Sequence, residues 1–77
     1  MIKLKSKIGE CIETRGLKIK FVADKLGVSR EQVGKWKNGK AFPRIDKLFE
    51  LALLLGVKVD DLYEVIDSSD TIENEEF

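Results

Sequence analysis

The 77-residue chain contains no histidine, one cysteine, one proline and one tryptophan, and its longest apolar run is the five-residue stretch 51–55. A single cysteine cannot form an internal disulfide, so the fold does not need an oxidising compartment. Five apolar residues are far too few to span a bilayer, which takes about 20. The N-terminal MIKLK lacks the apolar block of a signal peptide. We therefore expect a cytoplasmic protein.

The residues that enzymes use are also scarce. The chain offers no histidine base, no cluster of cysteine or histidine with metal-binding spacing, and no glycine-rich loop for a phosphate. Its carboxylates concentrate towards the C-terminal end, where no rigid element is expected to hold a pair. The sequence therefore predicts a protein without catalytic activity, metal or cofactor.

The formal net charge is zero, but the charge is unevenly distributed. All 14 Lys and Arg lie in residues 1–59 against six Asp and Glu, a net charge of +8, whereas residues 60–77 hold eight acidic residues and no basic one. A basic body suits a polyanion, and an acidic tail does not. Charge alone leaves a nucleic-acid surface and an ordinary solvated surface equally open.

Helical spacing of apolar residues predicts one small helical domain over residues 1–66. The helices are expected at about residues 4–15, 19–26, 30–37, 44–55 and 59–66. From Asp67 the sequence DSSDTIENEEF has no periodicity, so residues 67–77 are expected to form a flexible acidic tail. The predicted core is Leu4, Ile8, Cys11, Ile12, Val22, Ala23, Leu26, Val33, Trp36, Ile45, Leu48, Leu51, Ala52, Leu55 and Leu62.

The stretch 17–39 predicts two short helices joined by a tight turn. A small residue allows the helices to cross, a glycine tolerates the left-handed backbone of the turn, and a β-branched residue packs back onto the first helix; these are Ala23, Gly27 and Val33. Ser29 suits the N-cap of the second helix, and an Asn-Gly pair ends it.

With these residues the stretch resembles the helix-turn-helix of lambda-repressor-like, or XRE-type (Cro/cI-type), DNA-binding regulators. The family pattern is matched by Val22-Ala23, Leu26-Gly27-Val28-Ser29, Val33, Trp36 and Asn38-Gly39, and it continues through Pro43 and residues 48–63. The resemblance implies an all-α domain of five helices. It also implies a sequence-specific transcriptional regulator, expected to be a repressor, that binds duplex DNA as a homodimer.

In such a regulator the helix at about residues 30–37 enters the major groove. At 100° per residue, Val33 and Trp36 point inward and the opposite side faces out. Arg and Lys donate to guanine, Gln pairs with adenine and Glu accepts from cytosine. Gly34 either permits a close approach to DNA or is a neutral surface glycine. The expected base contacts are Arg30, Glu31, Gln32 and Lys35.

The resemblance also implies contacts to the sugar-phosphate backbone. The expected residues are Lys18, Lys20, Ser29, Lys37, Asn38, Lys40 and Arg44. The chain departs from the family at Ile19, where a glutamine contact is often found. It also departs at Ile12 and Lys37, which stand where the family often has an Arg–Glu ion pair, and we expect apolar packing to replace that pair.

Three apolar residues of the fourth helix exceed what one small core uses, and they predict a homodimer through the fourth and fifth helices; these are Phe49, Leu53 and Leu54. The alternative is that they cover the core under the last helix. For the whole chain, the alternative is a protein-interaction module, antitoxin-like or anti-repressor, that keeps the same fold. The acidic tail either competes with phosphate for the basic face or is a solvated end. No small-molecule effector is indicated.

Overall fold

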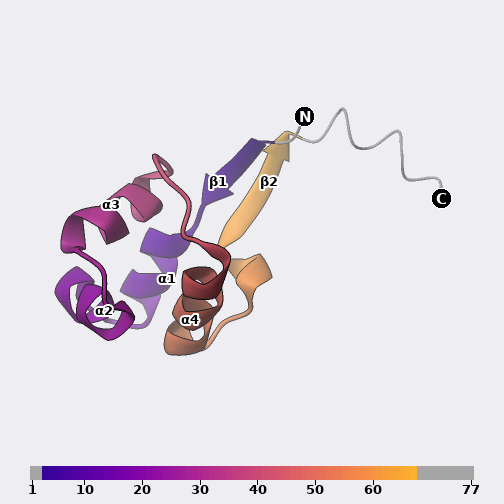
Figure 1. The fold of residues 1–77 in the computed structure, drawn as a ribbon. Coiled ribbons are helices and arrows are strands. Elements are labelled where there is room, and N and C mark those ends of the chain that lie inside the picture. Colours follow the sequence, from indigo (N-terminus) through magenta and orange to yellow (C-terminus); the bar gives the residue numbers. More distant parts are fainter. Residues whose placement is uncertain (1–2, 68–77) are drawn as a thin grey trace.

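The computed structural model describes residues 3–67. Four α-helices gather into one body, and a pair of strands projects from it, so that the two ends of the described chain lie together (Figure 1). The elements are β1 (Lys3–Ser6), α1 (Ile8–Thr14), α2 (Ile19–Leu26), α3 (Arg30–Asn38), α4 (Ile45–Leu55), a 3-10 turn (Val59–Asp61) and β2 (Tyr63–Asp67).

The core collects apolar side chains from all four helices and from the segment that leads into β2. Each fully buried aliphatic or aromatic side chain contributes about 1.5–3 kcal/mol. Cys11 and Leu48, which the periodicity also placed inside, are half-buried and pack against the core. The buried residues are Ile8, Ile12, Val22, Ala23, Leu26, Val33, Trp36, Leu51, Ala52, Leu55 and Leu62.

The helix-turn-helix forms as the sequence predicts. The α2 helix ends at Gly27, whose φ of 71° lies in the left-handed region that side chains disfavour. The Ser29 hydroxyl then accepts a hydrogen bond from the Gln32 amide at 3.0 Å and caps the start of α3. Gly39, with a φ of 77°, ends α3. Local sequence chemistry therefore determines both ends of the turn and the length of α3.

The expected fifth helix over residues 59–66 is wrong. A single 3-10 turn, Val59–Asp61, is followed by strand β2, which runs antiparallel to β1. Polar and apolar residues alternate over residues 3–5 of β1 and residues 63–65 of β2, and a period of two is that of a strand. The fold is therefore mostly helical with a two-stranded sheet, rather than an all-α domain of five helices. The paired residues include Leu4 with Val65, Lys5 with Glu64 and Ser6 with Tyr63.

The strand pair also changes both ends of the expected domain. Leu4, expected on the inner side of the first helix, lies in β1 and is exposed, because α1 begins only at Ile8. Asp67, assigned to the tail, is the last residue of β2. Residues 68–77, the remainder of the expected acidic tail, lie outside the described residues, so the boundary at 66–67 and the role of the tail stay predictions.

The fourth helix differs from its prediction at its first turn. It begins at Ile45 with Arg44 as N-cap, one residue later than the sequence predicts. Ile45 was expected in the core but is 69% exposed. The helix turns its other side inward, with Leu51, Ala52 and Leu55 buried. At 100° per residue, Ile45 lies at the margin of that buried face.

Candidate nucleic-acid interface

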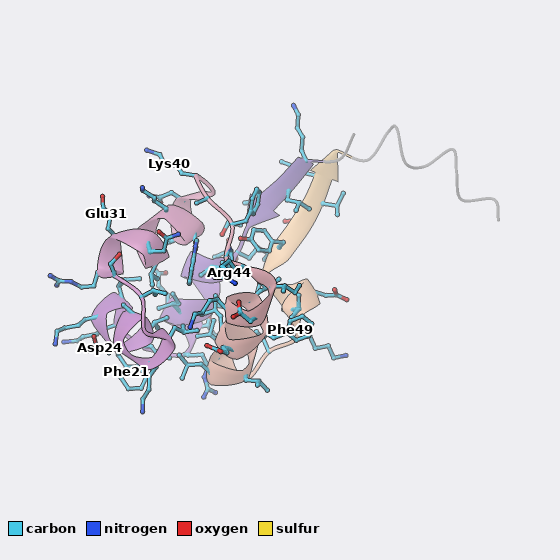
Figure 2. The ribbon with its side chains drawn as sticks, viewed as in Figure 1. Phe21, Asp24, Glu31, Lys40, Arg44 and Phe49 are labelled. Atoms are coloured by element: carbon cyan, nitrogen blue, oxygen red, sulfur yellow. The ribbon has the colours of Figure 1, made fainter. Side chains whose placement is uncertain are left out.

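The α3 helix has one side fixed by packing and the other open. Val33 and Trp36 are 0% and 2% exposed, and they hold the helix against the core. Of the four expected base-contacting residues, Gln32 is half-buried and the other three are exposed; these are Arg30, Glu31 and Lys35. In Figure 2, Glu31 projects from α3 into solvent on the side from which Lys40 also extends. The outer side of α3 therefore presents both donors and an acceptor to a partner.

All seven residues expected to contact the DNA backbone are exposed; these are Lys18, Lys20, Ser29, Lys37, Asn38, Lys40 and Arg44. The structure places them at the start of α2, in the turn, in the last turn of α3 and in the loop that follows α3. Two of the cations lie near carboxylates: Lys20 Nζ is 3.8 Å from Asp24 Oδ2, and Arg44 Nε is 4.0 Å from Asp46 Oδ1. Exposed pairs of this kind contribute little, so both cations can exchange their partner for a phosphate.

Lys37 lies on the flank of α3 nearest α1. A Cβ built on Gly9 would be 2.8 Å from Lys37 Cγ, so the aliphatic part of the lysine lies directly over the α1 backbone. Ile12 is buried, in agreement with apolar packing in place of the family's ion pair. Lys37 is thus partly committed to packing against α1.

A surface pocket of about 380 Å³ opens beside α3. Two cations and several hydrogen-bond donors line it, and no carboxylate does, which is the composition expected of a site for an anion. Its lining consists of Val28, Ser29, Gln32, Trp36, Phe42, Arg44 and Lys47. Phe42 and Lys47 were missed by the sequence reasoning.

Lys47 ties α4 to the turn of the motif. Its Nζ donates to the Leu26 carbonyl at 2.7 Å and to Glu50 Oε1 at 3.4 Å. Leu26 is the last residue of α2, and a cation is favourable at the negative end of a helix. The bond fixes the start of α4 relative to the helix-turn-helix. The sequence carried no signal for it, because Lys47 occupies an ordinary polar position in the α4 pattern.

The strand pair holds the other end of α3 and the loop that follows it. Ser6 Oγ in β1 donates to the Trp36 carbonyl at 2.7 Å. The Phe42 ring lies against the Tyr63 ring of β2, with centroids 5.6 Å apart and planes tilted by 52°. Burial raises the pKa of Tyr63. Within residues 3–67, Trp36 Nε1 and Tyr63 Oη are buried without a hydrogen-bond partner.

Cys11 is separate from this surface, between α1 and the 3-10 turn. Its thiol donates to the Asp61 carbonyl at 3.7 Å. Partial burial, with the Asp61 carboxylate as the next cause, raises the pKa of Cys11 above its ordinary value of 9.0. A thiol with a raised pKa is a poor nucleophile, in agreement with a structural role.

Comparison with known proteins places the chain in a family. A model of the helix-turn-helix family matches residues 8–62, from the start of α1 to the residue before β2. The chain is 30% identical over 76 residues to YonR, an uncharacterised HTH-type transcriptional regulator derived from the SPbeta prophage of Bacillus subtilis (strain 168), covering 86% of this chain and 70% of that protein. The chain belongs to the XRE-type, lambda-repressor-like helix-turn-helix family, a class of DNA-binding transcriptional regulators.

A solved structure shares the fold. The crystal structure of a candidate DNA-binding protein from Bacteroides fragilis superposes with a TM-score of 0.76 at 22% identity, covering 80% of this chain and all of that one. The family resemblance is therefore confirmed, and the interaction-module alternative is not favoured. None of the helices within residues 3–67 is long and apolar enough to cross a membrane.

Proposed function

We propose that the protein is a sequence-specific transcriptional repressor that places α3 in the major groove of its operator. The observation that carries this proposal is the division of α3 into two sides. Val33 and Trp36 anchor one side in the core, and the other side presents Arg30, Glu31 and Lys35. A helix held in this way keeps its orientation when it meets the bases, and occupancy of the operator then blocks polymerase.

The outer side of α3 carries chemistry for more than one base. Arg30 and Lys35 donate to guanine O6 and N7, and Glu31 accepts from a cytosine amino group. Each good contact of this kind discriminates by about 1–3 kcal/mol against the wrong base. Gly34 lies between these residues with nothing within 4 Å of the position of its missing Cβ, which leaves room for the groove wall.

The pocket beside α3 is the proposed place for a backbone phosphate. Ser29 Oγ accepts from the Gln32 amide, and its own hydroxyl proton remains available for donation. Arg44 is the more accessible of the two cations at the pocket, because Lys47 is engaged with α2. Phosphates bound here would set the register of α3 on the duplex without reading the sequence.

The operator is proposed to bind two copies. Phe49 is 54% exposed and Leu53 81% exposed, and together with Ile45 they recur at every fourth residue along α4. Leu54, the third residue expected at the interface, is half-buried against the core and lies outside this stripe, about 100° round the helix from Leu53. In Figure 2, Phe49 lies on the opposite side of the molecule from Glu31. A second copy on the α4 side therefore leaves both α3 helices open, and a two-fold pair would read half-sites about 34 Å apart.

Selection of bound fragments from random duplex DNA tests the proposal directly, and titration of the selected site in salt completes the test. We expect a pseudo-palindromic motif, with log K falling by about 0.9 for each phosphate contact against log salt. Arg44→Gln should lower that slope by about one for each phosphate that Arg44 neutralises. Lys58→Gln removes the same charge from an exposed residue beyond α4 and should leave the slope unchanged. Absence of a selected motif, or equal slopes for both variants, would contradict the proposal.

A further inference from the structure

The pocket beside α3 is larger and more apolar than a phosphate requires. Its volume of about 380 Å³ lies within the range of about 300–1,000 Å³ that small-molecule sites occupy. Val28, Trp36 and Phe42 line it with apolar surface, whereas a phosphate binds through cations and hydrogen-bond donors. A ligand that fills this pocket therefore needs an apolar body as well as a charge.

The cations and helix ends at the pocket favour a single negative group on the ligand. Ser29 is the N-cap of α3 and Arg44 the N-cap of α4, so the positive ends of two helix dipoles lie here. Lys47 is already engaged with the Leu26 carbonyl, so Arg44 is the cation of this pocket that can form a new pair. The Arg44 side chain is 87% exposed, and Figure 2 shows it between α3 and α4. A guanidinium binds a carboxylate through two parallel hydrogen bonds, so a monocarboxylate suits this site.

Two aromatic residues make the apolar wall suitable for a ring. Phe42 is 61% exposed, and its contact with the Tyr63 ring of β2 holds it in place, so a ligand ring can pack on its open side. Trp36 is 2% exposed, and its Nε1 donor has no hydrogen-bond partner within residues 3–67. Buried donors are nearly always paired. An unpartnered indole N–H on a residue of the pocket wall therefore points to an acceptor that this part of the chain does not supply.

Three other surface pockets of the described chain differ from this one in charge. Each is lined by at least one carboxylate: Asp24 in the first, Glu50 in the second, and Glu10 with Asp61 in the third. A carboxylate ligand would meet a like charge in each of them. The pocket beside α3 is lined by none, so its charge is the one that fits an organic anion.

We propose that this pocket binds a small aromatic carboxylate, and that such a ligand releases the protein from its operator. The carboxylate pairs with Arg44 and accepts from the Ser29 hydroxyl, and the ring packs against Phe42. The release from DNA rests on the proposed function, because the ligand and the backbone phosphate assigned to this pocket require the same Arg44. Binding of the ligand does not depend on whether α3 reads bases.

Fluorescence titration with benzoate tests the site, because Trp36 is the only tryptophan of the chain and lies in the pocket wall. Benzoate should change the Trp36 emission in a saturable way. Benzamide keeps the ring without the charge, and acetate keeps the charge without the ring, so both should bind about tenfold or more weakly. Arg44→Gln should raise the benzoate dissociation constant by about tenfold or more, whereas Lys58→Gln, which removes a charge elsewhere, should not.

Phe42→Leu tests the ring contact, because leucine keeps an apolar side chain against Tyr63 but cannot stack. It should weaken benzoate binding by about two- to tenfold. The matched control is Phe21→Leu, which changes another exposed phenylalanine outside this pocket and should bind benzoate normally. Absence of any saturable change with benzoate would overturn the site. Equal binding of benzoate and benzamide, or unchanged benzoate binding by both Arg44→Gln and Phe42→Leu, would overturn the proposed ligand.

Operator binding in the presence of benzoate tests the release from DNA. At about ten times its dissociation constant, benzoate competing for one site should raise the operator dissociation constant about tenfold. If benzoate binds as expected while operator affinity stays the same, the release is wrong and the site stands. If an operator is selected and bound while benzoate leaves the Trp36 emission unchanged, this inference is wrong and the proposed function stands. If benzoate binds and no operator is selected, the proposed function and the release are both wrong.

Discussion

Replacement of Gly34 by alanine separates the stability of α3 from its proposed contact with DNA. Gly34 lies inside α3 with ordinary helical backbone geometry, and no atom lies within 4 Å of the position a Cβ would take. Because nothing opposes the methyl group, the substitution should add the helix propensity of alanine, about 0.8–1.0 kcal/mol. For a domain of this size, that corresponds to a rise in Tm of about 4–8 °C.

Thermal unfolding followed by circular dichroism measures this gain, and Gly27→Ala is its matched control. The Cβ of residue 27 would also meet nothing within 4 Å, but the φ of 71° is one that alanine resists. The left-handed conformation costs a residue with a side chain about 1–2 kcal/mol. Gly27→Ala should therefore lower the Tm while Gly34→Ala raises it. A lower Tm for Gly34→Ala would refute the inference that α3 is open on this side.

The same variant tests the close approach to DNA. If α3 lies in the groove with Gly34 against its wall, a methyl group there overpacks the interface at a cost of about 1–3 kcal/mol. Gly34→Ala should then bind the operator about tenfold or more weakly while being the more stable protein. Unchanged affinity would show that Gly34 is a neutral surface glycine, the alternative that the sequence left open.

Three further predictions concern the framework of the site. Ser29→Ala removes the α3 cap and should lower the free energy of unfolding in urea by about 1 kcal/mol; an alanine variant as stable as the unmodified protein would show that the cap does not stabilise α3. Ser29→Asp keeps the cap but should weaken DNA binding, because its carboxylate repels phosphate. Lys47→Met removes the 2.7 Å bond to the Leu26 carbonyl and should lower stability by about 1 kcal/mol; an unchanged urea midpoint would show that the bond contributes nothing. Burial raises the pKa values of Cys11 and Tyr63, so above about pH 9 the unfolded chain binds fewer protons than the folded one, and stability should fall as pH rises. Cys11→Ser should reduce this loss of stability at high pH. A pH profile of stability identical to that of the unmodified protein would show that Cys11 does not contribute to the loss.

The helix-turn-helix was predictable because its signals are local. Gly27, Ser29 and Gly39 determine the turn and the ends of α3 through their own backbone and side-chain chemistry, and each lies within four residues of the groups it contacts. Val33 and Trp36 follow from helical periodicity alone. The position of each side chain on α3 could therefore be assigned from sequence, whereas its contact with DNA involves a partner that a single chain does not contain.

The strand pair was missed because its two halves lie at opposite ends of the sequence. The alternation of apolar and polar residues covers only three residues in each strand, and a segment with so short a pattern acquires strand structure only when it finds its partner. The bond from Lys47 to Leu26 was missed for a related reason. It joins residues 21 positions apart, and no periodicity signals it. Non-local pairing thus accounts for the wrong fifth helix and for the unexpected residues of the pocket.

The central claim is that α3 reads base edges, and the most direct measurement compares base preferences of α3 variants across all single-base changes in the selected operator. Arg30→Ala and Lys35→Ala should each flatten the preference at one base pair per half-site, by about 1–3 kcal/mol, if they contact bases. Glu31→Ala should strengthen non-specific binding, because an anion near phosphate is removed, while it reduces discrimination among sites. The account is contradicted if Glu31→Ala changes neither quantity while the two basic variants weaken every sequence equally, since α3 would then only position the protein on the backbone.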